Sequence, residues 1–104
     1  MIKHIVMWNM AGETKEDRRS AAEFLRSRFE ALRGEVPGLI HLEVGLDHSR
    51  VDYACDVVLY TEFESQEALD AYAIHPAHLR VKDELGRMRI ARFQVDYAVT
   101  PAAA

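Results

Sequence analysis

The fold is decided by the first strand-like stretch of the chain, Ile2–Met10, which reads IKHIVMWNM. Nearly every residue in it is apolar or aromatic. Alternate residues of a strand face opposite sides of a sheet. One parity here includes Val6 and Trp8, and the other includes Ile5 and Met7. Because both parities carry large apolar side chains, the stretch predicts a strand that is covered on both faces.

The rest of the chain alternates between helical and strand-like patterns. The pattern predicts a helix from Thr14 to about Arg33, strands over Leu39–Leu46 and Tyr53–Phe63, a helix from Ser65 to about Ile74, and a strand over Arg87–Val99. Thr14 and Asp17 are typical of a capping box, and Ser65 of an N-cap. A further helical turn or two within Leu79–Leu85 is left open. We expect one domain over residues 1–99 and a frayed tail over residues 100–104.

The order β-α-β-β-α-β predicts an α+β, ferredoxin-like fold, in which both helices cover one face of a four-stranded antiparallel sheet. The second face would then be bare in a single chain. The third predicted strand is also apolar at both parities, for example at Leu59 and Tyr60. An apolar sheet face of this size is typical of an interface. We therefore predict a homodimer in which two sheets pack face to face.

Composition narrows the possible functions. The chain has 104 residues, with 13 basic residues against 17 acidic ones and a net charge of −4, which argues against nucleic-acid binding. No stretch resembles a signal peptide or a membrane span, so no membrane partner and a cytoplasmic location are expected. Cys55 is the single cysteine, which excludes an intrachain disulfide and a thiolate metal cluster.

The segment Tyr72–His78, which reads YAIHPAH, concentrates the residues that can move protons. Histidine titrates near neutral pH, and a tyrosine hydroxyl can donate to an oxygen that gains charge. Pro76 disfavours a helical His75, so we expect the preceding helix to end here, with His78 in a loop and His75 capping that helix end. The segment holds no carboxylate, so we expect no metal and no cofactor.

Several motifs together resemble a known family. They are Ile2–Val6, Pro37-Gly38, Phe63-Glu64-Ser65, Tyr72-x-x-His75-Pro76-x-His78 and Asp96-Tyr97, in this order along the chain. The chain is similar, from Ile2 to about Tyr97, to the stress-responsive dimeric α+β barrel family, called Dabb. The resemblance implies a homodimer whose sheets form an α/β barrel.

Within this family, the motifs resemble those of olivetolic acid cyclase-like polyketide cyclases, which close a linear polyketide by an aldol condensation without a cofactor. The resemblance implies that His78 is a general base, that Tyr72 supports it, and that His4 lines the same pocket. The chain departs from that pattern at two places. Phe29 stands where the cyclase has a tyrosine, and the last strand offers Arg92 and Gln94 where the cyclase is apolar.

We therefore expect a pocket between the helices and the sheet of each subunit, which binds a small polar or anionic carbonyl or phenolic compound. The candidate catalytic residues are His78, Tyr72 and His4, and the candidate binding residues are Trp8, Leu59, Arg92, Gln94 and His75. With an ordinary histidine pKa, activity would change between about pH 5 and 8. Two alternatives stay open: a non-catalytic stress-response or ligand-binding dimer, and a cofactor-free or haem-degrading monooxygenase of the dimeric barrel type.

Overall fold

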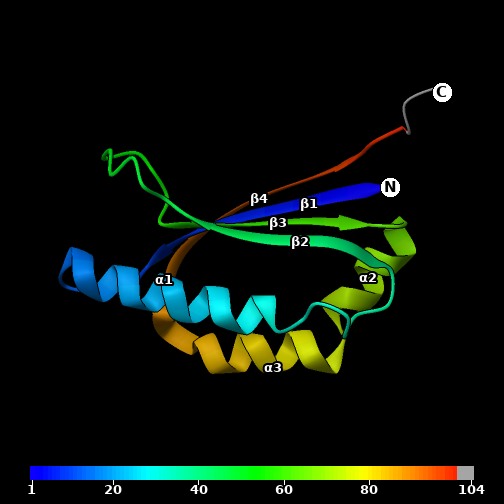
Figure 1. The fold of residues 1–104 in the computed structure, drawn as a ribbon, viewed down its shortest axis with the longest axis horizontal. Helices are drawn as coiled ribbons and strands as arrows, with labels where there is room; N and C mark the ends of the chain where they lie inside the picture. Colours follow the sequence, from blue (N-terminus) through cyan, green and yellow to red (C-terminus); the bar gives the residue numbers. More distant parts are fainter. Residues whose placement is uncertain (101–104) are drawn as a thin grey trace.

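The computed structural model describes residues 1–100 and arranges them as one sheet with all helices on the same side (Figure 1). The elements are β1 (Ile2–Met10), α1 (Lys15–Glu30), β2 (Leu39–Leu46), β3 (Val57–Phe63), α2 (Gln66–Ala73), α3 (Pro76–Leu85), a 3₁₀ turn (Gly86–Met88) and β4 (Arg89–Ala98). The strands lie in the order β2-β3-β1-β4, and all neighbours are antiparallel. The predicted ferredoxin-like α+β fold is confirmed. The predicted tail, apart from Thr100, lies outside the described residues.

Two element boundaries differ most from the prediction. Strand β3 begins at Val57 rather than Tyr53, whose side chain is 90% exposed in the preceding loop. Helix α3 starts at Pro76, so His78 lies inside a helix and not in a loop. Proline fits the first helical position because its missing N–H would have no partner there. His75 itself is extended, with φ −66° and ψ 135°, so the chain leaves the helical region only briefly before α3 begins.

The core lies between the helices and one face of the sheet. On β1 the even-numbered residues from His4 to Met10 are buried, as are the odd-numbered residues of β3 from Val57 to Phe63. Ala22, Leu25 and Phe29 of α1 pack against them. Burying a large apolar side chain contributes roughly 1.5–3 kcal/mol. This face therefore supplies most of the hydrophobic stabilisation of the single chain.

The opposite face of the sheet carries the second set of apolar side chains. Register places Met7 beside Phe93 and Ile5 beside Val95. Phe93, Val95 and Tyr97 are 53%, 51% and 45% exposed. No helix covers this side of the sheet in residues 1–100 (Figure 1). The prediction that β1 is apolar at both parities holds, but the single chain covers only one of its faces.

The helices are fixed at their ends by the predicted residues. The capping box of Thr14 and Asp17 and the N-cap of Ser65 are both confirmed. Gly38 lies at φ 81°, and a Cβ on it would come within 2.5 Å of the Cβ of Ala68. Only glycine allows both that conformation and that approach. The Pro37-Gly38 turn thus lets α2 sit close to the start of β2.

None of the helices in residues 1–100 is both long enough and apolar enough to cross a membrane. The cytoplasmic location expected from the sequence stays a prediction.

Candidate active site

The turn between α2 and α3 brings Tyr72 and His78 together over β1. Tyr72 is the last buried residue of α2, and His78 lies in the first turn of α3. His75 is the N-cap of α3, and its Nδ1 accepts the N–H of Ala77 at 3.0 Å. The expectation that His75 caps the end of the preceding helix is therefore wrong, because Pro76 starts a new helix at once. This nitrogen carries no proton while it accepts, so His75 has a structural role here.

Six rings form a continuous row between the helices and the sheet. The centroid distances are 5.4 Å for Trp8–Phe29, 6.4 Å for Phe29–His78, 4.1 Å for His78–Tyr72, 6.1 Å for Tyr72–His4 and 5.0 Å for Tyr72–Phe63. We call this set the ring row. It joins β1, β3 and all three helices. It also brings His4 of β1 together with Tyr72 and His78, which lie much later in the sequence.

His78 is held as a neutral imidazole within the ring row. Burial, opposed by hydrogen bonding to the carbonyl of Ala73, lowers the pKa of His78 to about 4. Electrostatic interactions with Lys82 and His4 lower the pKa of His78 in the same direction as burial. Nδ1 of His78 lies 3.4 Å from the Ala73 carbonyl oxygen. In the tautomer that donates this bond, the lone pair of Nε2 is left to accept a proton.

Two polar side chains of the ring row are buried without a hydrogen-bond partner in residues 1–100. They are the hydroxyl of Tyr72, which is 2% exposed, and the indole N–H of Trp8, which is 3% exposed. Burial raises the pKa of Tyr72, and the charge of Arg92 opposes this rise. A buried donor with no acceptor costs about 1–3 kcal/mol. Each of these donors is therefore suited to a ligand that brings an acceptor.

His4 forms the shortest polar contact of the site, with a residue that the sequence analysis did not select. Its Nδ1 lies 2.5 Å from Oδ1 of Asp96, and Asp96 also accepts from the side-chain amide of Gln94 at 2.9 Å. A carboxylate on one ring nitrogen fixes the tautomer and orients the other nitrogen. The signal for Asp96 was present in the sequence. It shares the parity of Arg92 and Gln94 on the last strand.

The register of β1 and β4 places the polar row of β4 beside the candidate residues of β1. Arg92 lies opposite Trp8, Gln94 opposite Val6, and Asp96 opposite His4, all on the helix side of the sheet. Arg92, Gln94 and Asp96 are exposed, although they share that side. Alternate residues of β1 are buried on this side, whereas β4 is exposed along most of its length, so a strip of β4 lies open beside the ring row. This strip is the exposed edge of the site.

Leu59 does not belong to this edge. It is 1% exposed in the core, opposite Val6 on β1 and Val44 on β2. A pocket was expected between the helices and the sheet, whereas the ring row is a set of packed side chains. Two cavities of about 420 Å³ each lie near the loop between β2 and β3, and neither is lined by His4, Tyr72 or His78. The candidate residues are thus packed together and open toward solvent mainly along β4.

Within residues 1–100, the structure places no three His, Cys, Asp or Glu side chains where they could hold one metal ion. The expectations of no metal and no cofactor stay predictions. The ring row offers two imidazoles and a phenol, and the adjoining strip of β4 adds the carboxylate of Asp96 and the guanidinium of Arg92. Such a set can move protons and stabilise a developing negative charge.

Comparison with solved structures shows the same fold in several proteins. A dimeric protein of unknown function with a ferredoxin-like fold from Bacteroides fragilis is 25% identical, with a TM-score of 0.82 over 94% of this chain and 95% of that chain. A hydroxynitrile lyase from Passiflora edulis is 12% identical, with a TM-score of 0.77 over 99% and 96%. An antibiotic biosynthesis monooxygenase is 18% identical, with a TM-score of 0.70 over 97% and 100%.

No match was found among curated protein sequences. A family model does match, and it describes the stress-responsive A/B barrel domain, Dabb. It covers residues 2–99, which is almost the whole chain. The motifs that suggested the family lie where the fold needs them: Pro37-Gly38 against α2, the histidine of β1 beside Asp96, and His75-Pro76 at the start of α3. The chain belongs to the stress-responsive A/B barrel domain (Dabb) family.

Proposed function

We propose that this protein is a cofactor-free acid–base enzyme that acts on a small polar carbonyl or phenolic compound, by an aldol-type ring closure or a lyase step. The observation that carries the proposal is the contact between a neutral His78 and Tyr72, whose buried hydroxyl has no partner among residues 1–100. A base and a hydrogen-bond donor thus lie side by side. Burying the Tyr72 hydroxyl without a partner costs stability, and this cost is explained if a substrate supplies the missing acceptor.

The proposed reaction uses the side chains in a fixed order. Nε2 of His78 takes a proton from the carbon next to a carbonyl group, and the hydroxyl of Tyr72 donates to the enolate oxygen. Arg92, which lies close enough to affect the pKa of Tyr72, balances the negative charge. The enolate carbon then forms a bond to a second carbonyl carbon, whose oxygen takes the proton from His78. In the lyase direction the same carbon–carbon bond breaks.

The low pKa of His78 limits the substrate class. A general base works best when its pKa lies near the working pH, and a pKa of about 4 makes His78 a weak base. It can remove only a proton that is already acidic, such as one between two carbonyl groups. We therefore propose a β-dicarbonyl or a similarly activated compound. His4, oriented by Asp96, is the second candidate for proton transfer.

We further propose that the protein is a homodimer through the bare face of the sheet. Phe93, Val95 and Tyr97 expose a continuous apolar row on β4, which is also an unpaired edge strand in the single chain. Exposed apolar edge strands are normally covered. The similar protein from Bacteroides fragilis is described as dimeric. Covering this face would leave the polar row of β4 free on the helix side.

The similar folds support more than one activity. That a hydroxynitrile lyase has this fold is compatible with lyase chemistry here, as analogy only. An antibiotic biosynthesis monooxygenase also has this fold. Oxidation is the alternative activity that the sequence left open, and the experiment that tests the acid–base reaction tests it too. The remaining alternative is a dimer that binds a ligand without converting it.

The test is exchange of solvent deuterium into β-diketones, followed by proton NMR, together with native mass spectrometry of the purified protein. We expect catalysed exchange that falls by about 10²–10⁴-fold in His78→Ala, while the fold and the dimer persist. If exchange survives this substitution, the role assigned to His78 is wrong. A bound ligand without any exchange would identify a binding protein, and a bound quinone or haem would favour oxidation.

A further inference from the structure

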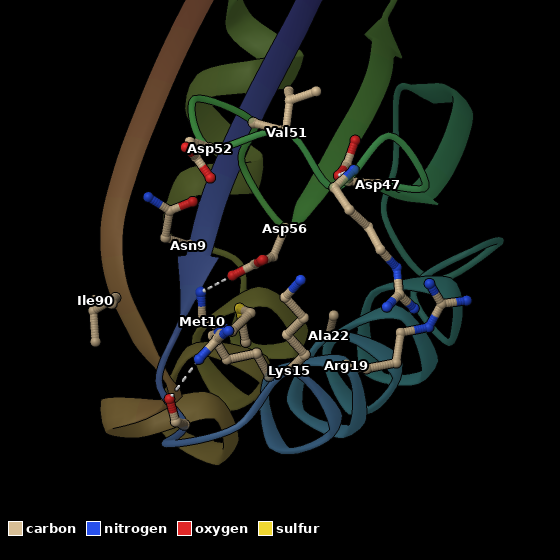
Figure 2. A pocket seen from close by; sticks show the side chains of 14 residues that line it. Asn9, Met10, Lys15, Arg19, Ala22, Asp47, Val51, Asp52, Asp56 and Ile90 are labelled. Atoms are coloured by element: carbon tan, nitrogen blue, oxygen red, sulfur yellow. Dashed lines mark hydrogen bonds between the residues drawn. The ribbon is translucent and has the colours of Figure 1, made fainter.

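A cavity of about 420 Å³ lies at the end of the sheet where β1 stops, away from the ring row (Figure 2). The start of α1 forms one wall and the loop between β2 and β3 forms the other. Small-molecule sites typically have volumes of about 300–1,000 Å³. The cavity is therefore large enough for a small metabolite. None of the residues that line it takes part in the proposed reaction.

The cavity is rich in positive charge. Four cationic side chains line it: Lys15, Arg18 and Arg19 from α1, and Arg50 from the loop. Figure 2 shows Lys15 and Arg19 reaching from the helix toward the space below Asp47 and Asp56. In a chain with a net charge of −4, four cations at one cavity are a local concentration.

Three carboxylates, those of Asp47, Asp52 and Asp56, also line the cavity, so four cations against three anions leave it a net charge of +1. Asp56 accepts the N–H of Met10 at 2.7 Å, and Asp47 accepts the N–H of Arg50 at 2.9 Å and the hydroxyl of Ser49 at 2.8 Å. These bonds lower the pKa of Asp47 and hold the loop in place. In residues 1–100 no ion pair joins a carboxylate of the cavity to any of its four cations.

Only some of the four cationic side chains have a hydrogen-bond or ion-pair partner within residues 1–100. Arg19 pairs with Glu23 on the exposed side of α1 at 3.3 Å, and one nitrogen of Arg18 donates to the carbonyl of Gly12 at 3.0 Å. Neither Lys15 nor the guanidinium of Arg50 has an ion-pair partner in the described part of the chain. The first turn of α1 is closed by its own capping box. Affinity for an anion would therefore come from the side chains rather than from the helix end.

We infer that this cavity is a second binding site, for a small dianion of the kind shared by phosphate monoesters and dicarboxylates. A single carboxylate would engage one cation and leave the others unused. A dianion can engage Lys15 and Arg50 together, from two different elements, and arginine binds both oxyanion types through two parallel hydrogen bonds. Asn9 and Asp52 in the lining can hydrogen-bond the uncharged part of such a ligand.

The experiment is a titration of the whole chain, followed by amide NMR, with inorganic phosphate or succinate and chloride added to hold the ionic strength constant. We expect saturable shifts at Asn9–Lys15 and Asp47–Asp52. The double variant Lys15→Gln/Arg50→Gln should weaken binding about tenfold or more, since each charged hydrogen bond is worth about one factor of ten. A control, Arg26→Gln/Arg80→Gln, removes the same charge outside the cavity and should change affinity less than about twofold.

Each outcome decides the inference. Saturation by phosphate alone assigns a phosphate site, saturation by succinate alone a dicarboxylate site, and saturation by both the shared dianion chemistry. Shifts that chloride reproduces, or equal weakening in the control variant, would reduce the effect to general electrostatics and overturn the inference. The titration of the wild-type protein can refute the inference by itself. The inference therefore stays testable even if a variant folds poorly. Deuterium exchange at the ring row should be unaffected by the double variant, which separates the two sites.

Discussion

The imidazole of His78 stacks on the phenol of Tyr72, with ring centroids 4.1 Å apart and planes inclined by 25°. Burial disfavours a charge on this imidazole, and the pKa of His78 falls to about 4. The contact therefore depends on a neutral histidine. It couples the stability of the α2–α3 turn to the protonation state of a candidate catalytic residue.

Stability should fall in acid as His78 becomes protonated. Between the ordinary pKa of 6.5 and the folded value of about 4, the unfolded chain binds a proton at His78 and the folded chain does not. Its contribution is thus complete above about pH 6.5 and is lost as the pH falls toward 4. We expect a loss of roughly 1–2 kcal/mol, because one pKa unit is worth about 1.4 kcal/mol and solvent screening reduces the effect at a partly exposed ring.

Urea unfolding of wild type and His78→Gln across this pH range measures the effect as a difference between the two proteins. His48→Gln is the control, because His48 is exposed in a loop. An NMR titration should give an apparent pKa near 4 for His78. A value near that of an exposed histidine would contradict the burial argument. The acid limb of any activity should also lie near pH 4, below the range that the sequence alone suggested.

Tyr72→Phe should separate function from stability. The substitution removes a buried hydroxyl that has no partner in residues 1–100 and keeps the ring stacked on His78. We expect the free energy of unfolding to stay the same or rise by up to about 1 kcal/mol, while deuterium exchange falls. Tyr60→Phe is the matched control, because the Tyr60 hydroxyl donates to Glu62 at 2.6 Å and its loss should destabilise by about 0.5–1.5 kcal/mol. Equal destabilisation of both variants would mean that Tyr72 is bonded in the folded protein.

Asp96→Asn should weaken both the fold and the reaction. His4 is 6% exposed and would lose its charged acceptor, at a cost of about 1–3 kcal/mol in unfolding free energy. Chemical denaturation measures this loss, and deuterium exchange should fall in the same variant because His4 is no longer oriented. Asp83→Asn, at an exposed position of α3, should change neither quantity. A double-mutant cycle with His4→Gln that showed no coupling would remove the pair from the mechanism.

The sequence predicted what depends on local pattern. The apolar residues at both parities of Ile2–Met10 predicted a strand, and the spacing of Thr14 and Asp17 predicted the start of α1. The same alternation put Arg92 and Gln94 on the side of β4 that also carries Asp96. These features follow from strand and helix periodicity, which a single sequence contains.

The remaining features depend on contacts between distant segments. The pairing of His4 with Asp96 needs the register of β1 and β4, which no local pattern supplies. The role of His75 was misread because Pro76 can either end a helix or begin one, and only the packing of α3 decides between them. The low pKa of His78 comes from burial under neighbouring elements. The ordinary histidine pKa gave an expected range of about pH 5 to 8, and burial of His78 moves that expectation to about pH 4.

The proposed dimer predicts that the same substitution at two adjacent residues of β4 weakens association at one position and not at the other. Val95 faces the bare side of the sheet and is 51% exposed, whereas Gln94 faces the helix side. Val95→Lys would bury an unpaired charge in both copies of a symmetric interface, which costs several kcal/mol. We expect the dimer dissociation constant to rise by about a hundredfold or more, since each factor of ten is about 1.4 kcal/mol. Gln94→Lys should leave association unchanged. Size-exclusion chromatography with light scattering over a dilution series measures both variants. A wild-type chain that is monomeric at micromolar concentration, or equal effects of the two substitutions, would show that this face is not the interface.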